Sequence, residues 1–600
     1  MSDERTAVIE YLRSNLIGPR DGTNEIISLD SPASFYTAGI LFPRGEDTER
    51  TILEEDPDVG ASGTVESDDA FPEDPVSLAN QQLPASAGLS FFLANSSKFV
   101  CEVKAAKYES QGEDNWKRSE LPEDGKWESV QIEGTTYVKP RPVLGKRAKL
   151  HVVNRSVTGG FIITVTLVNA AKETGKRGPS MHTPEKCLFQ VALRIKPGSG
   201  AQIEKYPHKF RALADNEEAE LELLYRNRAT YAIGHGCSTS WDTESESPKW
   251  VSTDFMPAVD VPPVKGHSDS HPVLRLDYLS DRNVENLAGT FSEFLEPYKS
   301  WIADFQKTLN NIEPGLQLAA KRVIQRLLDT ASRMESGATL ICSDPEIRSA
   351  FAIANRAMML QMHHSKDTLG GTAHSVNDDV ILPNSTTDID SEARWYPFQL
   401  AFLLLVIPSL SDLDNPDRAL VDLIWFPTGG GKTEAYLAAS AFEITLRRMR
   451  NPKKSGGTSV ISRYTLTLLT AQQFQRTAGL ACALELLRRD GIEELAGDPI
   501  TVGLWVGRDQ TPNNLRKARE FGLEIREDRR PNNRFGLDRC PWCGTTIVPT
   551  ARSARESDYG FTALDQEFRL RCPRSICPFS DVLPVQVVDE MLYREPPTIL

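Results

Sequence analysis

The sequence lacks any run of about 18 uncharged apolar residues, the shortest length expected of a membrane-spanning helix. Its longest apolar stretch, Leu400 to Pro408, is too short for that role and predicts part of a buried helix. The N-terminus carries acidic residues where a signal peptide would be basic, and no hydrophobic segment follows them. We therefore expect a cytoplasmic protein without a membrane partner.

Cysteine is also scarce, with nine residues in a chain of 600, and four of the nine form two pairs near the C-terminus. This distribution indicates reduced thiols and one metal site, and argues against a disulfide framework. The chain has no basic excess either, since its formal net charge is −15. This charge argues against a surface coated in nucleic-acid-binding groups but is compatible with a local basic channel, because binding depends on the potential at the groove.

The length predicts several domains, because 600 residues exceed what one hydrophobic core normally organises. We expect a multidomain fold that combines β and α/β parts. Its predicted order is an N-terminal helix and leader (1–44), an acidic flexible segment (45–84), a β-rich N-terminal domain (85–265), a helical connector (266–385) and a partial RecA-like parallel α/β lobe (386–600).

Hydrophobic periodicity gives the elements within this order. Helical spacing predicts a helix over residues 4–17 and further helices between 280 and 365. The segment 368–384 is rich in Gly, Asn and Asp, which predicts a loop. Alternating or β-branched segments predict a β-sandwich or barrel-like module with strands at Leu89–Phe99, Lys149–Asn154, Gly160–Asn169 and Cys187–Ile195.

A short motif in the β-rich part, Gly234-His235-Gly236-Cys237, contains two residue types that bind metals or act as nucleophiles. The sequence shows no second ligand pair and no acid that would orient the histidine. A structural turn is therefore the favoured interpretation.

The decisive segment is an apolar, strand-like stretch before a glycine-rich turn and a helix-forming stretch, the order that a phosphate loop requires. It comprises Val421–Phe426, then Pro427, Thr428, Gly429, Gly430, Gly431, Lys432 and Thr433, then Glu434 and the residues after it. A triphosphate needs several backbone N–H groups aimed at one point, which a glycine turn and a helix N-terminus supply. We expect Lys432 to contact the β- and γ-phosphates of ATP and Thr433 to hold Mg²⁺, so both are candidate catalytic residues.

Residue 426 is phenylalanine where the general phosphate-loop pattern has glycine, but PTGGGKT resembles the tighter loop of superfamily-2 helicases. Upstream, the segment from Arg394 to Gln399 resembles the Q-motif of these helicases, in which a glutamine reads the adenine edge. Gln399 is therefore a further candidate for nucleotide binding. The alternative is a residue cluster that only starts a helix.

Downstream, the strand-like segment Tyr464–Leu469 precedes a polar helix start that resembles motif Ia, which touches a nucleic-acid backbone. The alternative is an ordinary βα unit whose Gln-rich face is solvated. The candidate contacts to nucleic acid are Thr470, Gln472, Gln473 and Arg476.

The two C-terminal cysteine pairs have the spacing of zinc knuckles, with a C-x2-C followed by a C-x4-C. Four thiolates close a tetrahedral Zn²⁺ site and leave no open position, so this metal would be structural. The predicted ligands, within an insert over residues 530–585, are Cys540, Cys543, Cys572 and Cys577. The alternative is four unrelated cysteines.

Taken together, several segments resemble the large helicase component of the bacterial DISARM anti-phage systems, the DrmA type. They are IWFPTGGGKTEAYL, RYTLTLLTAQQFQR, GLWVGR, CPWCG and YREPPTIL, with LIGP, YTAGILFP and GHGC nearer the N-terminus. The resemblance implies a cytoplasmic, ATP-dependent, DNA-binding helicase-like protein. It also implies a second DISARM subunit, which carries a domain of unknown function, as its partner in defence against phage DNA.

The sequence departs from a complete helicase in one respect, because no convincing Walker B acid pair or second RecA-like lobe follows. Asp589-Glu590 comes after a β-like stretch but continues without a DEAH-like pattern. The resemblance therefore implies an N-terminal portion that binds nucleotide but does not unwind DNA alone. Two alternatives stay open: a zinc-containing repair or restriction helicase, and a non-catalytic scaffold that binds ATP and either DNA or a partner.

Overall fold

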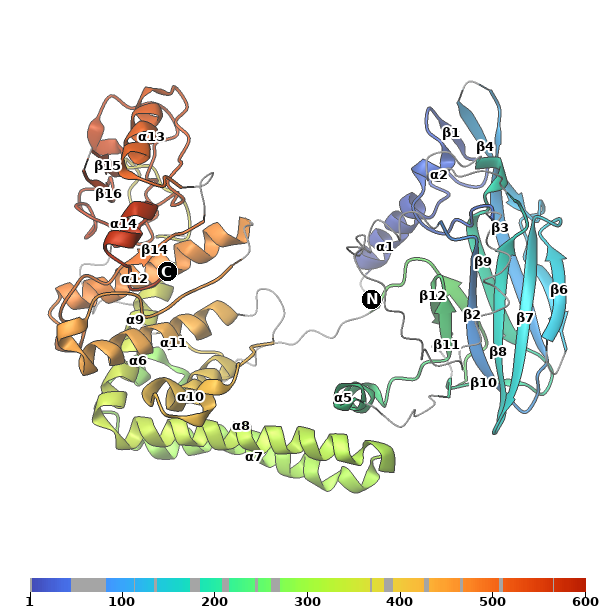
Figure 1. Cartoon of the computed structure of the whole chain (residues 1–600), viewed down its shortest axis with the longest axis horizontal. Coiled ribbons are helices and arrows are strands. Elements are labelled where there is room, and N and C mark those ends of the chain that lie inside the picture. Colours follow the sequence, from blue (N-terminus) through green and yellow to red (C-terminus); the bar gives the residue numbers. More distant parts are fainter. Residues whose placement is uncertain are drawn as a thin grey trace, which may run out of the picture. The chain divides into compact units, whose positions relative to one another are not determined.

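The chain divides into two compact units, residues 1–261 and 262–600, and each is described by itself (Figure 1). A computed structural model describes residues 3–44, 83–112, 114–133, 137–172, 184–207, 215–242, 247–259, 270–366, 369–382, 392–425, 431–464, 468–506, 511–564 and 566–600. None of the helices within these ranges combines the length and hydropathy that a bilayer crossing demands.

The N-terminal unit contains two antiparallel sheets. In the first, the strand order is β1 (Ile26–Ser28), β4 (Asn115–Leu121), β3 (Phe99–Ser110), β9 (Phe189–Pro197), β13 (Val251–Asp254) and β12 (Ser238–Trp241), and β3 also pairs with β5 (Glu128–Ile132). In the second, the order is β10 (Gln202–Glu204), β2 (Ser86–Ala94), β8 (Gly160–Asn169), β7 (Ala148–Val157) and β6 (Tyr137–Val143), and β2 also pairs with β11 (Ala232–His235). The helices in the described part of this unit are α1 (Asp3–Leu16), α2 (Pro32–Phe35) and α5 (Asn216–Tyr225).

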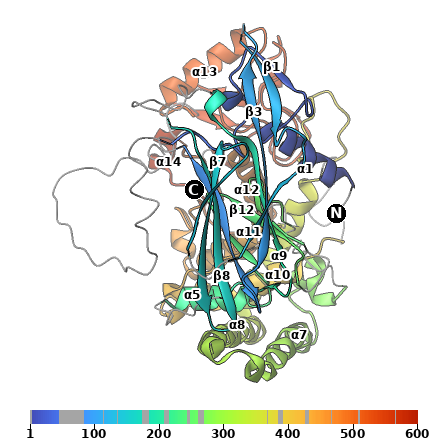
Figure 2. The same cartoon turned by 90° about the vertical axis from the view of Figure 1, so that its right-hand side faces the viewer.

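The two sheets pack face to face as a β-sandwich, because buried residues of both belong to one hydrophobic cluster. Phe91 of β2 and Phe99 of β3 meet edge to face across this core, with ring centroids 5.4 Å apart. The long strands β7 and β8 lie side by side in Figure 2. The predicted strand Gly160–Asn169 coincides with β8, and the predicted N-terminal helix coincides with α1.

One predicted strand in this unit is too long. The segment Leu89–Phe99 was expected to be continuous, but β2 ends at Ala94 and β3 begins at Phe99. The chain reverses between them, and Asn95 has a φ of +66°, a left-handed conformation that asparagine tolerates well. Four consecutive polar residues, 95–98, separate the two apolar stretches and mark this turn, so the predicted strand ran across a loop signal.

The C-terminal unit is mainly helical. Its helices are α6 (Leu276–Ser280), α7 (Leu287–Lys307), α8 (Gln317–Ser343), α9 (Pro345–His364), α10 (Pro397–Ser411), α11 (Lys432–Arg450), α12 (Leu468–Arg489), α13 (Leu515–Glu527) and α14 (Asp589–Arg594). The helices predicted between residues 280 and 365 are thus present, and α7 and α8 lie side by side as a long pair (Figure 1). Residues 369–382 form neither helix nor strand, as predicted for this loop.

Single residues explain where the central helix α9 starts and why α10 can pack closely against α8. The Asp344 side chain accepts hydrogen bonds from the N–H groups of Glu346 and Ile347, and Pro345 occupies the first turn. Helix α9 then packs against α6, α11 and α12. In α8, a Cβ at Gly337 would lie 1.9 Å from the carbonyl oxygen of Leu404, so glycine allows α8 and α10 to cross closely.

Four short segments of this unit run parallel to one another. Strand β14 (Val502–Gly503) pairs with β17 (Val585–Gln586), and Ile599 forms parallel bridges to both Val502 and Val460. The order across these segments is therefore 460, 599, 502, 585. Parallel pairing of segments joined by helices agrees with the predicted α/β character, whereas a RecA-like lobe stays a prediction. A separate antiparallel pair consists of β15 (Phe561–Ala563) and β16 (Phe568–Leu570).

The predicted strand Val421–Phe426 is wrong for residues 421–425, the part of it that the structure describes. A strand needs a neighbour that pairs with its backbone, and no described residue pairs with this segment in that way. The side chains of Val421, Leu423 and Trp425 are instead 95%, 82% and 76% exposed. The predicted strand Tyr464–Leu469 also differs, since α12 already begins at Leu468.

Candidate functional site

The start of helix α11 is the point where the glycine-rich turn meets the rest of the candidate site. Residues 426–430, which include Pro427, Thr428, Gly429 and Gly430, lie outside the described part of the chain. Gly431 has a φ of +84°, and α11 begins directly after it at Lys432. The N–H groups of the first helical turn, which make no hydrogen bond within the helix, therefore gather next to this glycine, together with the positive end of the helix dipole.

Replacing Gly431 with alanine is expected to lower the free energy of unfolding by about 1–2 kcal/mol, because an L side chain is strained in the left-handed conformation. The new Cβ would also lie only 2.7 Å from Gln399 Nε2. Urea unfolding followed by circular dichroism measures the change. The matched control is Gly315→Ala, because a Cβ at Gly315 meets open space. Equal stability of the two variants would contradict the prediction.

Gln399 joins the starts of α10 and α11. Its Oε1 accepts a hydrogen bond from the Tyr396 N–H at 2.8 Å, and its Nε2 donates to the Gly431 carbonyl at 2.6 Å. Gln399 is only 3% exposed, whereas Tyr396 is 44% exposed and its ring stacks on Phe398. Gln399 is thus the helix-start residue of one interpretation, and it also contacts Gly431 beside the phosphate loop. Its role in reading an adenine edge stays a prediction.

The Thr433 hydroxyl belongs to a hydrogen-bonded network between α11 and α12. It donates to Gln473 Oε1 at 3.0 Å, and the Tyr436 hydroxyl donates to the same oxygen at 3.1 Å. Tyr464 in turn donates to Tyr436 at 2.6 Å, and burial raises the pKa of Tyr464, so its phenol keeps its proton. The predicted Mg²⁺ ligand Thr433 and the predicted nucleic-acid contact Gln473 therefore touch each other.

A second contact links the same two helices. Arg476 Nη1 lies 3.1 Å from Glu434 Oε1 in an ion pair whose acid is largely buried. The other carboxylate oxygen, Glu434 Oε2, is buried and has no hydrogen-bond partner among the described residues. Of the other predicted contacts on α12, Gln472 is exposed and Thr470 lies in the first turn.

One cavity of about 780 Å³ is lined by Gln399, Gly431, Lys432, Thr433, Glu434, Gln472, Gln473 and Arg476, among others. Its lining includes the α11 start with Lys432, the polar start of α12, and residues from the loop after α9 and from the first cysteine pair. Four cationic side chains line it against one carboxylate, Glu434; the four are Arg394, Lys432, Arg476 and Arg539. The cavity is therefore locally basic in a chain of net charge −15, as a polyanion site requires.

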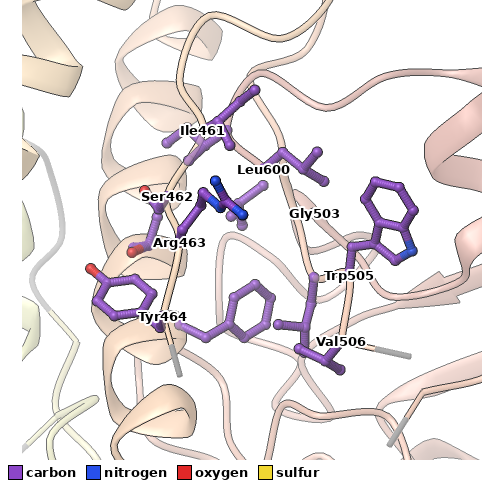
Figure 3. Close-up of a pocket in the computed structure, with 13 residues that line it drawn as sticks. Ile461, Ser462, Arg463, Tyr464, Gly503, Trp505, Val506 and Leu600 are labelled. Atoms are coloured by element: carbon purple, nitrogen blue, oxygen red, sulfur yellow. The ribbon is translucent and has the colours of Figure 1, made fainter. Parts of the chain in front are cut away.

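A second pocket, of about 430 Å³, lies between residues 461–464 and 503–506 beside Leu600 (Figure 3). Ile461, Tyr464 and Trp505 line it and are 67%, 42% and 57% exposed. Apart from Arg463, its lining residues are uncharged. The apolar lining makes this pocket a poor match for a phosphate ligand.

The four paired cysteines converge on one buried point. Their Sγ atoms all lie within 4.8 Å of one another, with 3.4 Å between Cys543 and Cys572 and 3.9 Å between Cys540 and Cys577. Tetrahedral ligands around zinc, at about 2.3 Å from the metal, are about 3.8 Å apart. Burial raises the pKa of the Cys540 thiol, so thiolates gathered here need a bound cation. The cluster therefore fits a metal ion such as zinc.

The other two motifs noted in the sequence have local partners. His235 Nε2 lies 2.7 Å from Ser90 Oγ, and the Cys237 thiol donates to the Gly88 carbonyl at 3.3 Å, which agrees with a structural turn. Glu590 accepts a hydrogen bond from the Leu515 N–H at 3.0 Å and thereby supports the start of α13. These contacts give the glutamate of the Asp589-Glu590 pair a local structural role.

No protein-family model matches the chain. The chain is 27% identical over 651 residues to DISARM protein DrmA of Bacillus paralicheniformis, an alignment that covers 99% of this chain. This similarity confirms the resemblance to DrmA-type proteins. The chain spans 55% of the length of that DrmA protein. An activity of the whole protein can therefore only be proposed for this chain.

Sequence reasoning about the DrmA-like motifs missed several residues of the cavity. Tyr396 lies within the segment that resembles the Q-motif but is not itself a candidate there, and no sequence signal points to Arg539. Only the fold shows that α9, α11, α12 and the first cysteine pair border the same space.

Proposed function

We propose that this DrmA-like chain contains the ATP-binding part of a helicase-like component of a DISARM anti-phage system. The observation that carries the proposal is the basic cavity in which the glycine-led start of α11 meets the polar start of α12. Its volume of about 780 Å³ lies within the range of about 300–1,000 Å³ typical of small-molecule sites.

The residues around this cavity suit a nucleoside triphosphate. Lys432 supplies a cation to the β- and γ-phosphates, and the first turn of α11 supplies backbone N–H donors. Gln399 holds the Gly431 carbonyl and so fixes the direction in which the turn enters the helix. Tyr396, exposed at the edge of the cavity, offers a flat ring for the adenine.

Mg²⁺ bound with the triphosphate neutralises charge on the phosphate oxygens. Thr433 would hold this ion through its hydroxyl, which would then give up its hydrogen bond to Gln473. Glu434 Oε2, buried and without a described partner, would be available as an acceptor when ATP and Mg²⁺ are bound. Because Gln473 and Arg476 lie on α12, occupancy of the nucleotide site also changes the helix that we propose contacts DNA through Thr470, Gln472, Gln473 and Arg476.

The whole protein would use this site to drive movement on DNA, in the cytoplasm and together with a second DISARM subunit. The four-cysteine cluster would hold a structural zinc ion, because all four ligand positions are protein thiolates. The non-catalytic scaffold differs from this proposal in one measurable property, which is DNA-stimulated ATP hydrolysis by the full-length protein.

Titration of the chain with a fluorescent ATP analogue and Mg²⁺ tests the proposal. We expect saturable binding that excess ATP reverses and that weakens without Mg²⁺, since the metal screens phosphate repulsion. Competition by ATP should also exceed competition by AMP, because the cationic side chains act on the terminal phosphates. A folded sample without saturable binding would contradict the proposed function.

A further inference from the structure

One wall of the candidate nucleotide cavity comes from the knuckle, which we define as residues 539–544 around the first cysteine pair. Arg539 and Pro541, on either side of the predicted zinc ligand Cys540, line the same cavity as Lys432 and Thr433. The knuckle is far from the phosphate loop in sequence, and it lies outside the segments that resemble the Q-motif and motif Ia. Its presence here places the cysteine cluster beside the ligand site.

The Arg539 side chain is fixed by backbone carbonyls of the loop after α9, which lines the same cavity. Its Nε donates to the Gly370 carbonyl and its Nη2 donates to the Gly371 carbonyl, both at 3.0 Å. Gln475 of α12 donates to the Arg539 carbonyl at 3.3 Å. Within the described part of the chain, the third nitrogen, Nη1, has no hydrogen-bond partner. The guanidinium is therefore held in a fixed orientation, and its Nη1 can still donate a hydrogen bond to a ligand.

The knuckle and the loop after α9 pack backbone to backbone. The His374 N–H donates to the Gly544 carbonyl at 2.8 Å, and the Thr546 N–H donates back to the His374 carbonyl at 2.9 Å. A Cβ at Gly544 would lie 2.2 Å from the Thr372 carbonyl oxygen, and a Cβ at Gly370 would lie 2.3 Å from the Pro541 carbonyl oxygen. Glycine is thus required on both sides of this contact.

Aromatic stacking holds the knuckle against the end of α9. The rings of His364 and Trp542 stack with centroids 3.5 Å apart and planes 19° apart, and His364 Nδ1 lies 2.8 Å from the Trp542 carbonyl oxygen. Trp542 sits between the ligands Cys540 and Cys543. The conformation that presents Arg539 to the cavity therefore depends on the closed shape of the cysteine cluster.

We propose that the knuckle is part of the nucleotide site: Arg539 donates to a phosphate oxygen of the bound nucleotide, and zinc loading sets the nucleotide affinity. An arginine suits this role because its rigid planar fork can keep two contacts to the protein while a third nitrogen faces the anion. The inference rests on the proposed ATP binding. It adds a phosphate-contacting residue and makes the zinc ion a regulator of that site.

The first test compares Arg539→Ala and Arg539→Lys with the control Arg530→Ala, an exposed arginine of the same region that does not line the cavity. We expect Arg539→Ala to weaken ATP binding by about tenfold or more and AMP binding by less than threefold, since a contact to the terminal phosphates is lost. Arg539→Lys should retain part of the affinity. Zinc content should stay equal in all variants.

The outcomes separate this inference from the proposed function. If the unmodified chain does not bind ATP, the proposed function fails. If it binds ATP and Lys432→Ala weakens binding, but Arg539→Ala behaves like Arg530→Ala, only the present inference fails. Equal weakening of ATP and AMP by Arg539→Ala would show a purely structural role and would also overturn the phosphate contact.

The second test removes zinc with a chelator, dialyses the chelator away, and measures ATP binding in fresh Mg²⁺. We expect ATP affinity to fall at least tenfold and to return when Zn²⁺ is added. Hydrogen exchange supplies an independent readout, because the amides of Gly370 and His374 should exchange faster in the zinc-free chain. Unchanged ATP affinity in a sample shown by metal analysis to lack zinc would refute the coupling.

Discussion

Replacing Lys432 with alanine is expected to weaken ATP binding by about 10- to 100-fold, which corresponds to losing one charge-assisted hydrogen bond to phosphate. Lys432 is the first residue of α11 and lines the basic cavity, so its removal takes away a cation at the point where the helix dipole also favours anions. The measurement is the titration with a fluorescent ATP analogue and Mg²⁺.

The matched control is Lys453→Ala, which removes an exposed lysine after the end of α11 that does not line the cavity. This variant should bind ATP like the unmodified chain, because Lys453 does not line the cavity. It is a matched control because both substitutions remove one positive charge. In the full-length protein, Lys432→Ala should also abolish DNA-stimulated ATP hydrolysis. The interpretation of the cavity as a phosphate site is wrong if the two lysine variants bind ATP equally well.

Short-range features of the fold could be predicted from the sequence. Helix α1, the loop over 369–382 and strand β8 depend on local periodicity and on Gly, Asn and Asp, which act within a few residues. The pairing of Cys540 with Cys543 could likewise be predicted, because a C-x2-C turn places two ligands together without help from the rest of the fold. The site with all four ligands could be predicted because the sequence contains one further cysteine pair of suitable spacing, Cys572 and Cys577.

Features that depend on distant partners could not be predicted in this way. The segment 421–425 has strand-like residues, but no described neighbour pairs with its backbone, and pairing decides whether a strand exists. Arg539 reaches Gly370, 169 positions earlier in the chain, through a contact that no local pattern signals. The hydrogen bond from Thr433 to Gln473 likewise joins the phosphate loop to the segment that resembles motif Ia, and no local pattern indicates this contact.

Replacing Cys543 with serine is expected to reduce bound zinc from one ion per chain to almost none and to unfold the region 530–585. Cys543 and the other three ligands are buried with their Sγ atoms within 4.8 Å of one another, so the site has no room for a substitute ligand from solvent. Structural zinc contributes on the order of 10–16 kcal/mol to small zinc domains, which rivals the whole stability of a typical protein. Metal analysis and limited proteolysis measure the two effects.

The matched control is Cys342→Ser, because Cys342 is only partly buried and lies in α8 outside the cluster. Thermal unfolding then distinguishes a local effect from a general one. The N-terminal unit has its own core around Phe91 and Phe99, so its transition should not move, whereas the transition of the C-terminal unit should fall in Cys543→Ser. Acidification should release zinc in the same way, because the ligands must be deprotonated to bind the metal. Full zinc occupancy in Cys543→Ser would show that the four cysteines do not form the metal site.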